Sequence, residues 1–133
     1  MNVSINVWAV IVGGVAHWVI GALWYMVLFA GPWSKLKGID ANAEGDGSNP
    51  LLYLAALVIG VVMAAGLAVV LSLVGHPPIG ISIAIALIVW VAFTSAPAFA
   101  NAIFGGSVAL WAIDNAYPLV SLVVMSVILA AWR

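Results

Sequence analysis

Apolar residues run along the chain in four long blocks, and short polar or turn-forming segments separate them. The blocks cover residues 5–31, 51–75, 79–104 and 108–132. A helix needs about 20 predominantly apolar residues to cross the hydrocarbon core of a bilayer. Each block reaches this length, so the pattern predicts four transmembrane helices.

The connections between the blocks predict how these helices are arranged. Gly75-His76-Pro77-Pro78 and Gly105-Gly106-Ser107 are short and rich in residues that end helices. Short connections place successive helices antiparallel to one another. We therefore expect an all-α fold, a four-helix transmembrane bundle in up-down-up-down order. Residues 1–133 then form a single integral membrane domain with both termini at one membrane face.

The composition excludes most soluble classes of protein. Hydrophobic residues make up 67% of the chain and charged residues only 5%, whereas soluble domains carry about 25% charged residues. A cytosolic enzyme, a nucleic-acid binder and a disordered chain are therefore excluded. The net charge is −1 and cysteine is absent. We expect membrane lipid as a partner, no nucleic acid, no metal and no cofactor.

Most of the charge lies in the polar loop over residues 32–50, where we expect a flexible connection rich in turn formers. Its positive residues favour a cytoplasmic position for this loop. Residues 40–48 resemble the start of an EF-hand calcium loop, but Leu51 stands where a bidentate glutamate belongs. We do not interpret this segment as a calcium site. The charged residues of the loop are Lys35, Lys37, Asp40, Glu44 and Asp46.

Small residues recur at every fourth position in three of the blocks, and such rows let helices approach closely in lipid. They predict tight packing, either within one chain or between copies. Because four helices enclose little interior, we also expect a homo-oligomer or a partner membrane protein. The positions expected to pack in the first two blocks are Gly13, Gly21, Ala56, Gly60, Ala64 and Ala68, and the third block carries Ala92, Ala96 and Ala100.

A layer of polar residues is predicted near the loop-facing end of the bundle. With a helical rise of about 1.5 Å per residue, Tyr25 and Asp114 each lie about 9 Å from the ends of their blocks, and Asn101 lies about 5 Å from its end. Asn115 and Tyr117 fall near the same depth. Antiparallel helices would therefore bring these side chains to one level.

Asp114 is the only acidic residue inside any block, and a charged carboxylate there costs a few kcal/mol on insertion scales (about 2.5–3.5). It must be protonated, paired, or in contact with water or protein. One interpretation is a site for an ion, a proton or a polar substrate formed with Asn101 and Tyr25. The other is structural, because an acidic residue near a helix start complements the helix dipole.

His17 and the tryptophans lie at other depths. His17 is about 18 Å from the start of its block, near the bilayer centre, where it would join helices by a hydrogen bond or relay protons. Trp33 is expected to anchor the chain at the membrane interface, as Trp8, Trp111 and Trp132 do at their block ends. Trp18 and Trp90 fall near mid-span and are expected to contact lipid or fill packing space.

The sequence resembles the small prokaryotic four-span membrane proteins called domain of unknown function 1761. The resemblance rests on Gly21-Ala-Leu-Trp24-Tyr25 in the first block and on Asp114-Asn-Ala-Tyr117 in the fourth, together with Asn101 at the end of the third. It implies a helical bundle in a prokaryotic cytoplasmic (inner) membrane. It implies no activity.

Three classes of function stay open on the sequence alone. The first is a structural or accessory protein that acts through helix packing in an oligomer. The second is a small channel or transporter with a polar site around Asp114, and the third is a binder of lipid or another hydrophobic ligand. We do not expect an enzyme, because the chain lacks the common metalloprotease, serine hydrolase and phosphate-loop motifs.

Overall fold

The structure is a computed structural model that describes residues 3–37 and 50–132. Segment 40–48, with its resemblance to a calcium loop, lies outside the described residues. All the described elements are helical. In chain order they are α1 (Val7–Leu23), η1 (Trp24–Leu28), α2 (Ala30–Lys37), α3 (Pro50–Leu73), α4 (Ile79–Val89), η3 (Trp90–Ser95), α5 (Ala96–Gly105) and α6 (Val108–Ala131), where η denotes a π-helix.

In the described part of the chain, four continuous helical segments are long and apolar enough to cross a membrane. They are Val7–Leu28, Pro50–Leu73, Ile79–Gly105 and Val108–Ala131. The predicted all-α fold with four transmembrane helices is therefore confirmed. The first span ends earlier than expected, because the chain turns at Phe29 and continues as the separate helix α2.

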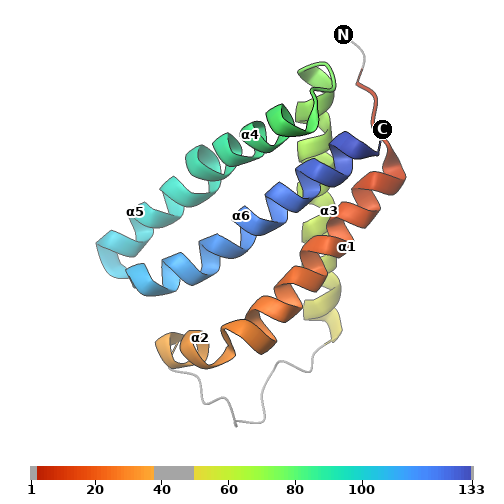
Figure 1. Ribbon diagram of the computed structural model, residues 1–133. Coiled ribbons are helices and arrows are strands. Elements are labelled where there is room, and N and C mark those ends of the chain that lie inside the picture. The colour runs from red at the N-terminus through yellow and green to blue at the C-terminus, as the bar shows by residue number, and fades with distance from the viewer. Residues whose placement is uncertain (1–2, 38–49, 133) are drawn as a thin grey trace.

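The four spans are arranged around a central pair of helices, α1 and α6. α1 packs most extensively against α3 and α6, and α6 also packs against α4, whereas α3 and α4 touch only slightly. Figure 1 shows both chain ends at the same end of the molecule, as the antiparallel order predicts. α3 crosses behind α1 and α6, and α4 with α5 lies along the other side of α6 (Figure 1).

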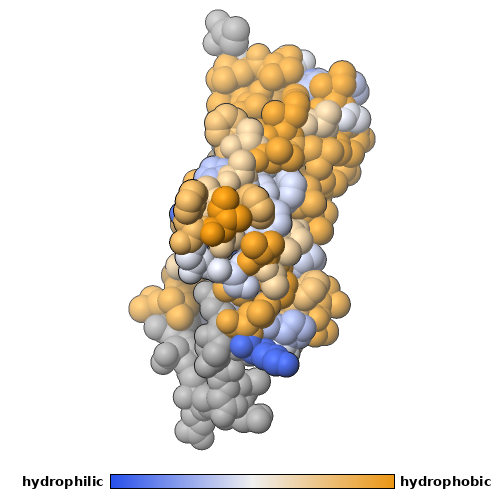
Figure 2. All heavy atoms as spheres, turned by 90° about the vertical axis from the view of Figure 1, so that its left-hand side faces the viewer, coloured by the Kyte–Doolittle hydropathy of each residue, from blue (hydrophilic) through white to orange (hydrophobic). Residues whose placement is uncertain are grey.

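The outer surface of the bundle is apolar. Phe93 and Phe104 expose 77% and 88% of their surface, and many valines, leucines and isoleucines are exposed along all four spans. Figure 2 shows apolar residues over much of one such face, with the most hydrophilic spheres gathered at its lower end. An exposed apolar surface of this extent matches lipid rather than water. The chain is an integral membrane protein.

The small-residue rows of α1 and α3 face each other inside one chain. A Cβ atom added to Gly13 would lie 3.3 Å from the Cβ of Ala64, and one added to Gly60 would lie 2.7 Å from the carbonyl oxygen of Gly14. Gly14 belongs to the same contact, because an added Cβ there would lie 2.5 Å from the Val61 side chain and 2.8 Å from its backbone. Gly14 was not among the predicted packing positions.

The other predicted packing positions have different surroundings. Ala68 is buried in the core between the spans, whereas Ala56 is only half-buried. The row on the third span is not used within the chain, since Ala92, Ala96 and Ala100 are all exposed.

The two connections that are described carry the expected turn chemistry. Gly75 and His76 both have positive φ angles, of 93° and 55°, a conformation that glycine adopts without a steric penalty. At the other connection, the Ser107 hydroxyl accepts a hydrogen bond from the Leu110 amide and caps α6. The first span begins in the same way, because the Asn6 side chain accepts hydrogen bonds from the amides of Trp8 and Ala9.

Candidate functional site

Asp114 is held at the loop-facing end of the bundle by two aromatic side chains. The Tyr25 hydroxyl donates a hydrogen bond of 2.8 Å to Oδ1 of Asp114, and the Trp33 indole N–H donates one of 2.9 Å to the same oxygen. Both donors are neutral groups. Among the described residues no lysine or arginine forms an ion pair with Asp114. The carboxylate is therefore hydrogen-bonded but has no positive partner there.

The local geometry of the chain brings Trp33 to this carboxylate. η1 is a π-helix in which the Phe29 amide donates to the Trp24 carbonyl, and Phe29 leaves the helix with φ −122° and ψ 18°. The following helix, α2, then packs against α6. Trp33 thus reaches a side chain of the fourth span, beyond the role of interface anchor predicted for it.

Tyr117 lies at the centre of an aromatic cluster between α1 and α6. Its hydroxyl donates a hydrogen bond of 2.7 Å to the His17 carbonyl, and its ring stacks on the His17 imidazole at 4.5 Å. Trp24 and Tyr25 lie around the same ring, at 6.4 and 5.6 Å. Gly21 makes room for it, because an added Cβ would lie 2.5 Å from the Tyr117 hydroxyl.

His17 contributes differently from its predicted role. Its imidazole is buried, and Nδ1 has no hydrogen-bond partner among the described residues. The contact between α1 and α6 is made instead by ring stacking and by the backbone carbonyl of His17. The expected side-chain hydrogen bond to a neighbouring helix is therefore not found there.

The two asparagines predicted for the polar layer do not join Asp114. Asn101 is exposed on α5. Asn115 is buried, but its side-chain amide donates to the Trp111 carbonyl of its own helix at 2.9 Å. The backbone carbonyl of Asn115 accepts a 2.7 Å hydrogen bond from the Trp90 indole. Asn115 thus connects α6 to η3, on a different side of α6 from the helices that hold Asp114.

A groove of about 650 Å³ lies beside Asp114 and its two donors. We call it the aromatic groove. Residues of α1, η1, α2, α3 and α6 line it, and its walls include Trp18, Tyr25, Trp33, Tyr53, Ala56 and Tyr117. Sequence reasoning did not identify this groove, because its walls come from segments far apart in the chain. The number of aromatic residues near the loop-facing end is the sequence feature that could have indicated the groove.

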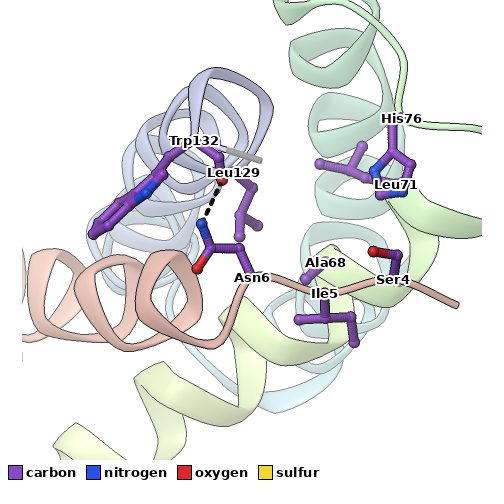
Figure 3. A pocket seen from close by; sticks show the side chains of 8 residues that line it. All are labelled: Ser4, Ile5, Asn6, Ala68, Leu71, His76, Leu129 and Trp132. Carbon is purple, nitrogen blue, oxygen red and sulfur yellow. Dashed lines mark hydrogen bonds between the residues drawn. The ribbon is translucent and has the colours of Figure 1, made fainter.

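A smaller cavity of about 300 Å³ lies at the opposite end of α1, beside the chain termini. Figure 3 shows its lining, with the Asn6 side chain reaching across to the Trp132 carbonyl over 3.2 Å. The Ser4 amide also donates to the Ser72 hydroxyl at 2.8 Å. These hydrogen bonds join the first residues to α3 and to the end of α6. We interpret this cavity as part of the seam between the two chain ends.

The chemistry available in the aromatic groove is that of binding. Its lining is predominantly apolar and includes several aromatic rings, two of which are hydrogen-bonded to a carboxylate. Among the described residues, no group of three histidine, aspartate or glutamate side chains is placed to hold a metal ion.

A family model described as "Protein of unknown function (DUF1761)" matches residues 8–130. The chain belongs to this family. The match to DUF1761 extends over all four spans and includes Tyr25, Trp33, Asp114 and Tyr117. No curated protein and no solved structure matches the chain. Membership of DUF1761, a family of unknown function, assigns no activity to the chain.

Proposed function

We propose that this DUF1761 protein binds a hydrophobic or amphipathic small molecule in the aromatic groove. The observation that carries the proposal is the groove itself, a largely apolar space of about 650 Å³ with Asp114 and its donors Tyr25 and Trp33 beside it. Ligand pockets in proteins have volumes of about 300–1,000 Å³ and combine apolar walls with a few fixed polar groups. The groove has both properties.

The ligand would enter from the membrane. Trp18 and Met26, which line the groove, expose 38% and 56% of their surface on the outside of the bundle. Leu52, on the α3 wall, is 57% exposed. A molecule dissolved in the bilayer therefore reaches the groove without crossing the protein core. We expect this bilayer to be the cytoplasmic membrane of a prokaryote, as the family resemblance implies.

The groove favours ligand binding over the two other classes considered. The small-residue rows of α1 and α3 are occupied by each other, so they do not supply a surface for association between copies. The homo-oligomer or partner protein expected from the sequence stays a prediction. A polar path for transport would need Asn101 beside Asp114 and Tyr25, and Asn101 is exposed on α5.

Photo-crosslinking tests this proposal directly. The protein in lipid nanodiscs is exposed to an uncharged monoacylglycerol that carries a diazirine on its alkyl chain, and labelled peptides are mapped by mass spectrometry. We expect saturable labelling of the segment 18–26 and of α3 near Leu52 and Ala56. Ala56→Phe adds a ring on the groove wall and should reduce saturable labelling about tenfold or more, because the ring occupies ligand space.

Ala55→Phe provides the matched control, because Ala55 is exposed on the same helix and does not line the groove. Its labelling should equal that of the unmodified protein. Labelling that rises linearly with probe concentration, and that neither substitution changes, would mean that the probe only samples the lipid-facing surface. That result would overturn the proposal.

A further inference from the structure

Among the residues that the structure describes, Asp114 has no positively charged partner beside the groove. Its Oδ1 accepts hydrogen bonds from Tyr25 and Trp33, and both of these donors are uncharged groups. Charged groups placed within a membrane protein are usually paired with an opposite charge. Because the transmembrane spans contain no lysine or arginine, the complement at this depth has to come from outside the spans. A cation bound in the groove would supply it.

The rings beside the carboxylate are arranged as walls around a shared space. Tyr25 meets Trp33 at 5.4 Å with an angle of 70° between their planes, and it meets Tyr117 at 5.6 Å and 88°. All three rings also line the groove. A cation is attracted to a ring face when it lies within about 6 Å of the ring centre. Because these rings lie at steep angles to one another and all line the groove, a cation bound there would lie beside more than one ring.

The hydrogen bonds to Asp114 strengthen the attraction of the Tyr25 and Trp33 rings for a cation. A donor that is bonded to a carboxylate is polarised, so electron density shifts from the donated hydrogen toward the ring. The Tyr25 phenol and the Trp33 indole are both polarised in this way by the same oxygen. Attraction between charges is also stronger in a low-dielectric environment than in water. The carboxylate and the rings thus favour the same kind of ligand.

We infer that the ligand of the aromatic groove is a lipophilic ammonium ion, with its cationic head against Tyr25, Trp33 and Tyr117 and its apolar part along α3. This inference rests on the proposed function and names its ligand class. The volume of about 650 Å³ lies in the range for drug-sized molecules. It therefore favours a compact or single-chain amine over a whole diacyl phospholipid.

A pair of competitors with the same chain tests the inference. Dodecyltrimethylammonium and dodecyldimethylamine N-oxide have heads of similar size, but at alkaline pH only the first carries a net charge. Each is titrated, below its micelle concentration, against the uncharged diazirine probe bound to the protein in nanodiscs. We expect the ammonium ion to compete at a concentration lower by about tenfold or more, from combined cation–π and charge attraction.

Asp114→Asn should remove most of this preference while leaving the probe bound. The asparagine oxygen still accepts hydrogen bonds from Tyr25 and Trp33, so the rings keep their positions, but the charge is lost. The two competitors should then differ by about twofold or less. Trp33→Leu removes a ring and keeps the carboxylate, and it should also reduce the preference. Asn101→Ala, at an exposed amide on α5, is the matched control and should retain it in full.

The possible outcomes separate this inference from the proposal beneath it. Saturable probe labelling with equal competition by both amphiphiles would overturn the ammonium ligand and leave the groove as a binding site. An unchanged preference in both Asp114→Asn and Trp33→Leu would also overturn it. If Asp114→Asn abolishes labelling altogether, Trp33→Leu alone decides. Probe labelling that never saturates in the unmodified protein would overturn the proposed function itself.

Discussion

Gly14→Val is expected to force α1 away from α3 and to destabilise the bundle by about 3 kcal/mol or more, at the upper end of the range for overpacked cores. The Cβ atom alone would lie within 2.8 Å of the Val61 backbone and 2.5 Å from its side chain. Backbone atoms of a helix cannot move aside singly, so the whole contact has to open. Titration with sodium dodecyl sulfate in mixed micelles, followed by circular dichroism, measures the loss.

Gly66→Val is the control for this prediction, because Gly66 lies in α3 with no atom within 4 Å of an added Cβ. Its unfolding transition should stay within about 0.5 kcal/mol of the unmodified protein, as is usual for exposed substitutions. Equal transitions for the two variants would show that α1 and α3 do not approach as closely at Gly14 as the structure places them.

Tyr117→Ala is expected to cost about 3 kcal/mol, the lower end of the range for replacing an aromatic core residue by alanine, because the ring is half-buried. The substitution removes the ring that stacks on His17 and that contacts Trp24 and Tyr25. It also removes the hydrogen bond to the His17 carbonyl. The same titration measures the effect, and probe labelling of the aromatic groove should fall because Tyr117 forms part of its wall.

Tyr117→Phe separates the ring from the hydroxyl. It retains the aromatic contacts and loses only the hydrogen bond to His17, so a cost of about 1 kcal/mol is expected. A loss equal to that of the alanine variant would assign the stabilisation to the hydroxyl rather than to the ring. That result would contradict the packing role described for Tyr117.

The four spans and part of the candidate site could be predicted from the sequence alone. Hydrophobic length defined four membrane helices, since a bilayer sets a minimum length for a spanning helix. Depth along antiparallel helices placed Tyr25 and Asp114 at one level, and the structure joins these residues by a hydrogen bond. Depth was sufficient here because each side chain also points toward the other helix.

Depth along a helix does not fix the rotation of that helix about its axis, so the sequence could not predict which side chains face Asp114. Asn101 lies at a similar level but is exposed, and Asn115 is directed at its own helix and at Trp90. The sequence did not predict Trp33 as a partner of Asp114. Trp33 reaches Asp114 because the chain turns at Phe29, and no residue pattern predicts that turn. The close approach at Gly14 likewise depends on which face α1 turns toward α3.

The hydrogen bonds that Asp114 accepts from Tyr25 and Trp33 also bear on the order in which the chain is made. Tyr25 and Asp114 are separated by 89 positions, which a ribosome covers in about 4–18 s at typical synthesis rates. Tyr25 and Trp33 are therefore synthesised before Asp114, the acceptor that they share. When α6 follows, its carboxylate meets donors that are in place, which offsets part of its cost of insertion. We therefore expect Tyr25 and Trp33 to guide the docking of the last span.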